Sequence, residues 1–292
     1  MAIGGSASGE PGAGPTVRRI ILGAQLRRLR EGMQLSRADA GYTIRASESK
    51  MRRLETGQVG FKERDVADLL TLYGVTNAVE RQQFLDLVTQ SNQLGWWHPY
   101  TDLIPKWFED YVGLEEAAAR IQCYELMFVP GLLQTEEYAR AVAGHGEPRP
   151  ADDEIQRRVD LRRQRQKILI GPNAPKLWAI IDEAVLHRPL GGVRVLRDQI
   201  GHLLEMTTQP NVAVQVVPYH KSGSAAESAF TLLRFAEPDL PNIAYVEHVA
   251  GALYVEKFED IEVYGRAMDR LAVSAETPDG SRQLLSKLRA EL

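Results

Sequence analysis

Cysteine and long apolar runs are nearly absent from the sequence, and each shortage excludes a class of protein. Cys123 is the one cysteine among 292 residues, which rules out an internal disulfide framework and a zinc finger and suits a reducing compartment. No apolar run approaches the roughly 20 residues of a membrane-spanning helix. Residues 1–15 are rich in Gly, Ala, Pro and Ser and have no cationic segment followed by an apolar one. We therefore expect a disordered tail there, no signal peptide and a cytoplasmic protein without membrane contact.

Signatures of catalytic and metal sites are also missing. Two segments hold candidate ligands, Asp182–His187 and Glu247-His248, but neither has a recognised ligand spacing, and adjacent residues of a strand face opposite ways. We interpret them as surface or satisfied side chains. There is no Gly-rich phosphate loop and no nucleophile elbow, and Cys123 lies in an apolar segment where burial makes a thiol inert. The sequence thus predicts no enzyme, no cofactor and no metal.

Charge is distributed unevenly along the chain. The net charge is −4, yet residues 1–57 hold ten Lys/Arg against five Asp/Glu, whereas the remaining 235 hold 25 against 34. The length favours two domains. A basic head on an acidic body is typical of a DNA-binding protein with a separate effector or partner domain.

The stretch Leu35–Gly57, LSRADAGYTIRASESKMRRLETG, predicts two short helices joined by a tight turn. Ser36 and Ser47 are good N-caps, the chain turns at Arg45-Ala46, and Gly57 ends the second helix. Met51 and Leu54 form a thin apolar seam on that helix, and its opposite face is polar and rich in cations. Such a helix suits the DNA major groove. A solvated surface helix in a bundle fits the spacing equally well.

This stretch resembles the helix-turn-helix of the lambda-repressor-like (Xre) regulators, without a gap over 23 residues. The family pattern is carried by Leu35-Ser36-Arg37, Ala40-Gly41, Ser47–Met51 and Arg53–Gly57. The resemblance implies an all-α, five-helix domain. Two positions depart from the pattern. The turn position that is usually Gly is Arg45, which costs about 1 kcal/mol in a left-handed conformation, and the usual Gln is Arg37.

The resemblance and the helical wheel together assign roles on double-stranded DNA. We expect phosphate contacts from one group of side chains and base-edge contacts from another. Arg52 is the best candidate for a bidentate guanine contact, whereas Arg53 could instead form a structural ion pair with Glu55. A single module of this size binds weakly, so we expect a homodimer on an inverted repeat. The phosphate group consists of Arg37, Arg45, Ser47 and Lys50, and the base group of Glu48, Ser49, Arg52 and Arg53.

The pattern of apolar residues divides the chain into a helical domain at residues 16–93, an aromatic connector at 94–106 and an α+β domain at 107–292. We expect the second domain to hold a mixed or antiparallel sheet of about five strands. Its helix Asp152–Ile170 carries six cations, which indicate either a phosphate or nucleotide site or a surface helix paired with the acidic body. The arginines of the first helix, Val17–Gly32, are interpreted mainly as a solvated face, with phosphate steering possible for Arg27 and Arg28.

The residues from about Trp96 onward resemble the Scr-type antitoxin-like domain that follows Xre helix-turn-helix domains in actinobacterial regulators. The resemblance implies a transcription factor, often encoded beside a small partner protein, and no settled chemistry. Two alternatives remain open: an antitoxin-like protein that mainly sequesters this neighbour, and a regulator that senses a small molecule. The stretches that carry the resemblance are Trp107–Ala117, Tyr124–Ala141, Arg162–Ile168, Ile181–Leu190, Met206–Pro218 and Ile243–Val246.

Overall fold

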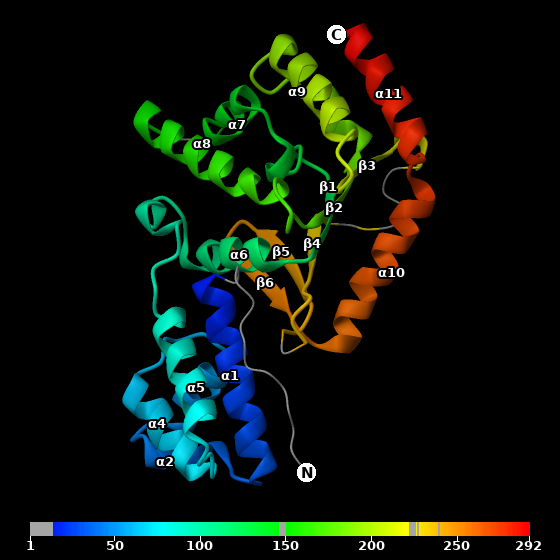
Figure 1. Ribbon diagram of the computed structural model, residues 1–292. Helices are drawn as coiled ribbons and strands as arrows, with labels where there is room; N and C mark the ends of the chain where they lie inside the picture. The colour runs from blue at the N-terminus through cyan, green and yellow to red at the C-terminus, as the bar shows by residue number, and fades with distance from the viewer. Residues whose placement is uncertain (1–13, 146–149, 222–225, 227, 239) are drawn as a thin grey trace. The chain divides into compact units, whose positions relative to one another are not determined.

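The computed structural model describes residues 14–145, 150–221, 226, 228–238 and 240–292 (Figure 1). Most of the expected tail at residues 1–15 lies outside these ranges. The chain divides into two compact units. The first runs to His98 and includes 236–240, and the second holds Pro99–Phe235 and Pro241–Leu292. The expected aromatic connector is thus divided between the units at His98. No helix in the described ranges is long and apolar enough to cross a membrane.

The first unit contains the five helices that the sequence predicts. Local signals set their ends: Ser36, Ser47 and Asn77 each accept a hydrogen bond from a backbone N–H in the first turn of the helix that follows. Such caps satisfy donors that have no partner within the helix. The helices are α1 (Pro15–Gly32), α2 (Arg37–Thr43), α3 (Glu48–Glu55), α4 (Glu63–Leu72) and α5 (Ala78–Ser91).

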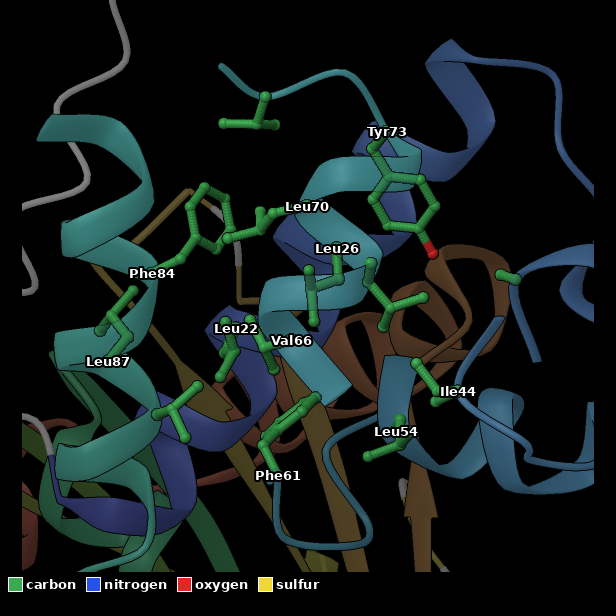
Figure 2. Close-up of a cluster of buried hydrophobic side chains, with 14 of the residues drawn as sticks. Leu22, Leu26, Ile44, Leu54, Phe61, Val66, Leu70, Tyr73, Phe84 and Leu87 are labelled. Atoms are coloured by element: carbon green, nitrogen blue, oxygen red, sulfur yellow. The ribbon is translucent and has the colours of Figure 1, made fainter. Parts of the chain in front are cut away.

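A buried apolar cluster holds these helices together (Figure 2). It draws Leu22 and Leu26 from α1, Leu54 from α3, Leu70 from α4 and Phe84 from α5, each at most 5% exposed. Helices of 7 to 18 residues are marginal on their own in water. Burial of each large apolar side chain contributes about 1.5–3 kcal/mol, so mutual packing fixes α3 on the domain.

The second unit is an α+β domain whose described residues form one mixed sheet of six strands, one more than the approximate number expected. The strand order is β3-β2-β1-β4-β5-β6. The first three strands are parallel, and β4, β5 and β6 continue the sheet antiparallel from β1. The strands are β1 (Arg120–Glu125), β2 (Lys176–Asp182), β3 (Val212–Val217), β4 (Phe230–Arg234), β5 (Ile243–His248) and β6 (Gly251–Val255).

Helices cover both faces of the sheet, so β1, β2 and β3 are buried along most of their length. One face packs its apolar residues, such as Tyr124 and Phe230, against α10. The other carries Cys123 and Tyr245, and Tyr245 stacks on Tyr111 of α6 with ring centroids 4.2 Å apart. The helices of this unit are α6 (Lys106–Ala117), α7 (Glu136–Ala143), α8 (Asp152–Gln166), α9 (Val193–Met206), α10 (Phe258–Ser274) and α11 (Pro278–Glu291).

Two elements of the second unit are shorter than the sequence pattern indicates. The expected strand Lys176–Leu186 ends at Asp182, where the Asp182 carboxylate accepts a hydrogen bond from the Ala184 N–H at 2.9 Å. This cap starts a 3₁₀ turn, η4 (Glu183–His187), in place of further strand. The expected helix Asp152–Ile170 ends at Gln166 and continues as a 3₁₀ turn, η3 (Lys167–Leu169).

Candidate nucleic-acid interface

Helix α2 begins with a reciprocal pair of hydrogen bonds. The Ser36 hydroxyl accepts from the Asp39 N–H at 3.1 Å, and the Asp39 carboxylate accepts from the Ser36 N–H at 3.1 Å. This capping box satisfies two backbone donors and fixes the start of the helix. Hydrogen bonds from the Ser36 hydroxyl and N–H lower the pKa of Asp39, so the carboxylate stays charged beside the positive end of α2.

The turn between α2 and α3 is a six-residue C-cap motif centred on Arg45. The Ala46 N–H donates to the Gly41 carbonyl at 2.8 Å and the Arg45 N–H to the Tyr42 carbonyl at 3.2 Å, which is the Schellman pattern. Its closing residue adopts a left-handed conformation, and Arg45 has φ +53°. A Cβ on Gly41 would lie 2.6 Å from the Ala46 carbonyl oxygen, so Gly41 permits the tight turn.

Helix α3 presents the two faces that the sequence predicts. Ser47 caps it by accepting from the Lys50 N–H at 3.2 Å. Met51 and Leu54 are 0% and 3% exposed, so the apolar seam faces the core. The polar side chains of the helix lie on the surface, and Gly57 follows its end with φ +68°. The exposed residues of this segment are Arg45, Ser47, Glu48, Ser49, Lys50, Arg52 and Arg53.

A buried carboxylate at the end of α3 joins three helices. The side chain of Glu55 is 1% exposed and binds the Arg30 Nε at 2.5 Å and the Arg37 Nε at 2.8 Å. The hydrogen bond to Glu55 raises the pKa of Arg30. Because Arg30 lies on α1 and Arg37 on α2, this ion network fixes the recognition helix candidate against both.

The network changes the interpretation of three sequence-predicted residues. Arg30 is not part of a solvated face, because its side chain is only 7% exposed and paired. Arg53 is exposed, and the structural ion pair considered for it goes to other arginines instead. Arg37 is 32% exposed and already bound through its Nε, so a phosphate contact from its remaining N–H groups stays a prediction.

Close packing between α1 and α3 adds to this restraint. A Cβ on Gly23 of α1 would lie 2.5 Å from the Leu54 carbonyl oxygen and 2.7 Å from that of Glu55. A side chain at position 23 would therefore displace the backbone of α3. Arg19 of α1 also donates from its Nε to the Gly57 carbonyl at 2.7 Å, which anchors the segment that follows α3.

Sequence reasoning missed one large side chain beside the turn. Tyr42, in the last turn of α2, is 88% exposed. An aromatic ring this exposed beside a polar helix face is unusual. Tyr hydroxyls are among the groups that contact phosphates. The sequence did hold a signal for this exposure. The small residues Ala40 and Gly41 face inward, so the next residue, Tyr42, points to solvent.

Comparison with protein families identifies both units. A model described as a helix-turn-helix domain matches residues 21–84, which contain α2, the turn and α3. A second model, described as a domain of unknown function (DUF5753), matches residues 108–287, more than half of the chain. The chain belongs to the DUF5753 family. No curated protein and no solved structure matches it.

Four of the five arginines of α8 in the DUF5753 domain pair with carboxylates, and the fifth, Arg162, donates to the Ala139 carbonyl at 3.4 Å. The pairing agrees with a helix held by acidic side chains, but not all of the cations lie on the surface. Arg165 is buried and binds Glu115 through two hydrogen bonds of 2.8 Å. Arg157 binds Asp102 at 2.7 Å, and Arg158 and Arg163 bind glutamates at 2.7 and 3.0 Å. Paired guanidinium groups are poorly available to an added phosphate, which weighs against a nucleotide site on this helix.

The candidate ligand segments of the DUF5753 domain do not converge into a metal site. His187 contacts Glu183 at 3.2 Å, and Tyr219 donates its N–H to the same carboxylate at 2.8 Å. Within the described ranges no three His, Cys, Asp or Glu side chains gather in a way that could hold a metal ion. Burial raises the pKa of Cys123 well above its ordinary value, so its thiol stays protonated and unreactive.

Proposed function

We propose that the chain is a sequence-specific, DNA-binding transcriptional regulator of the Xre type that works in the cytoplasm, with α3 as its recognition helix. The observation that carries the proposal is the contrast between two sets of arginines. Four of the five arginines of α8 are paired with carboxylates, whereas Arg45, Arg52 and Arg53 form no ion pair within the described ranges. Exposed, unpaired cations on a rigidly held helix are what a phosphate backbone and guanine edges require.

The proposed contacts divide by chemistry. Arg52 would donate two hydrogen bonds to one guanine, with Ser49 and Arg53 on neighbouring bases and Glu48 accepting from a cytosine amino group. Lys50, Ser47 and Arg45 would hold the helix in register through phosphates, with Arg37 assisting. Lys50 lies 4.0 Å from Asp65, a long and partly exposed pairing that a phosphate can replace.

The DUF5753 domain is proposed to supply dimerisation and control. One helix-turn-helix unit buries too little surface for tight specific binding, so a homodimer on an inverted repeat is expected. Control would come from a small protein encoded nearby, docked on the acidic second unit. The proposal assigns the chain no catalytic step and no cofactor.

DNA selection followed by affinity measurement tests the proposal. The operator is first selected from random duplexes with the full chain. Arg52→Ala should then weaken operator binding by about 1–3 kcal/mol and relax one base preference. Lys50→Ala should weaken operator and random DNA equally and reduce the slope of log K against log salt by about one.

Arg194→Ala is the matched control, because Arg194 is an exposed arginine of α9 in the second unit and, among the described residues, pairs with Asp198 alone, at 3.5 Å. It removes the same charge without touching the proposed interface. Unchanged operator affinity in Arg52→Ala, or an equal loss in Arg194→Ala, would refute α3 as the recognition helix. Repeating the selection with the neighbour-encoded protein present tests whether that protein regulates DNA binding through the second unit.

A further inference from the structure

The two edge strands of the six-stranded sheet, β3 and β6, differ in whether their outward backbone groups have hydrogen-bond partners. At the β3 edge, backbone groups that point away from the sheet have partners: the Glu276 N–H donates to the Val216 carbonyl at 2.9 Å, and the Val216 N–H donates to the Ser281 hydroxyl at 2.9 Å. The start of α11 thus closes this edge. A covered edge cannot recruit another strand.

Among the described residues of the second unit, no backbone group bonds to the outer side of β6 in the same way. β6 is the last strand of the sheet and pairs on one side with β5 (Figure 1). From Gly251 to Val255 it contains no charge and no proline, and those are the devices with which proteins usually protect an edge strand. An uncharged open edge is a template for strand pairing.

Exposed apolar side chains surround this edge. Leu253, in the middle of β6, is 53% exposed, although its cross-strand partner Val246 is partly buried against the α10 side of the sheet. Phe258, three residues after the strand, is 73% exposed, and Val249 in the β5–β6 turn is completely exposed. These exposed apolar residues are spaced along the strand, from the turn before it to the helix after it, and exposed apolar surface favours an interaction.

The register of the hairpin shows which backbone groups point outward. His248 and Gly251 flank a two-residue turn and pair with each other, which makes them a hydrogen-bonded pair. Hydrogen-bonded and non-bonded positions alternate along an antiparallel ladder. Leu253 therefore bonds to β5, and the N–H and C=O groups of Ala252 and Tyr254 point to the open side.

We infer that β6 is a dimer interface at which a second copy of this chain adds its own β6 antiparallel, with Leu253 on the two-fold axis. In this register Ala252 of each copy faces Tyr254 of the other, and each of these pairs exchanges both backbone hydrogen bonds. Leu253 meets its own counterpart as a non-bonded pair, in which side chains approach most closely. No like charges oppose each other because the strand is uncharged.

The choice of a second copy, rather than a foreign strand, rests in part on the proposed function, because an inverted repeat requires two-fold related units. It rests also on the sequence of the strand: two antiparallel copies of β6 can pair with Leu253 opposite Leu253 and with no like charges opposed. An isologous interface needs this property. The inference names the surface through which the DUF5753 domain would bring two helix-turn-helix units together.

Association of the full chain in the absence of DNA tests the inference. Sedimentation equilibrium of the wild-type protein should show a dimer. Leu253→Asp places two carboxylates opposite each other and removes apolar burial, so it should raise the dimer dissociation constant by at least about 100-fold. Val273→Asp is the matched control, because Val273 of α10 is 84% exposed and lies away from β6 in sequence.

A backbone variant separates strand pairing from side-chain effects. Ala252→Pro removes an outward N–H and leaves the ladder to β5 intact, so it should fold and remain monomeric. Leu253→Pro removes an inward N–H and should reduce the thermal stability as well. Circular dichroism distinguishes the two outcomes.

Cross-linking tests the predicted register. Leu253→Cys should form an intermolecular disulfide under mild oxidation, because non-bonded pairs place Cα atoms about 4.5 Å apart. Val273→Cys should not, and the native Cys123 is buried and silent. A monomeric wild type, a dimer that survives both Leu253→Asp and Ala252→Pro, or an edge that pairs only with another protein overturns the inference. The Arg52→Ala measurement on DNA is independent of all three.

Discussion

Replacing Glu55 by glutamine removes the buried carboxylate that Arg30 and Arg37 share and leaves the volume of the side chain nearly unchanged. Loss of one partner from a buried ion pair typically costs about 3–5 kcal/mol, because the remaining charge stays desolvated. Glu31 also contacts Arg30 at 3.3 Å, but its side chain is 50% exposed, so it compensates little. We expect a loss near the lower limit, about 3 kcal/mol, since Arg37 can turn to solvent.

Hydrogen exchange of the full chain, read by mass spectrometry on peptides that cover α3, measures this loss locally. A change of about 3 kcal/mol lowers the protection of the α3 amides by about 100-fold, provided that they exchange through opening of the first unit. Glu48→Gln is the control, because it removes the same charge from an exposed position of the same helix. Peptides of the second unit provide an internal reference.

A paired substitution distinguishes an ionic role from simple packing. Arg30→Met combined with Glu55→Leu replaces both buried charges by apolar groups, which is often neutral. It should restore much of the protection that Glu55→Gln loses. If Glu55→Gln changes protection less than tenfold, or if the paired variant is worse than the single one, the ion network does not hold α3 in place.

Two further predictions concern the turn and the second unit. Arg45→Gly should stabilise the first unit by about 1 kcal/mol in denaturant unfolding, because glycine adopts the left-handed conformation without strain. Arg45→Ala should keep the strain. Both variants should weaken DNA binding equally if the guanidinium contacts phosphate. Burial raises the pKa of Glu125, at the end of β1, to about 8, so ionisation of this carboxyl opposes folding. The free energy of unfolding is undiminished below the unfolded pKa of about 4.5 and falls as the pH rises towards 8. The total decrease is at most about 5 kcal/mol. Unfolding at pH 5 and pH 8 should therefore show Glu125→Gln within about 1 kcal/mol of wild type at the lower pH and clearly more stable at the higher. Equal stability at both would contradict the assignment.

The sequence predicted best those features that depend on neighbouring residues. Ser36 and Ser47 cap their helices as expected, and Gly57 ends α3, because each signal acts within one helical turn. The left-handed conformation at Arg45 was foreseen as a cost from the family position. These local signals also located the candidate recognition helix and its exposed face, whose contacts with DNA remain predictions.

Features that depend on distant residues were harder to predict. Arg30 resembled its solvated neighbours because its partner, Glu55, lies 25 residues later in the chain. The strand order could not be read from apolar alternation, since the residues of β4 that pair with β1 lie about 110 positions later in the chain. The end of β2 was misplaced because the Asp182 cap competes with an apolar run, Ala184–Leu186, that suits a strand equally well.

The position of β1 has a consequence for synthesis on the ribosome. β1 pairs in parallel with β2 on one side and antiparallel with β4 on the other. As the nascent chain leaves the ribosome, the parallel strands β1, β2 and β3 can assemble once Val217 has emerged. The other side of β1 stays unpaired until Phe230–Arg234 has been translated. Between these two points the central strand of the finished domain is an edge. A pause or truncation in that interval would present Ile121 and Cys123, both buried in the complete protein, to chaperones and to other unfinished copies.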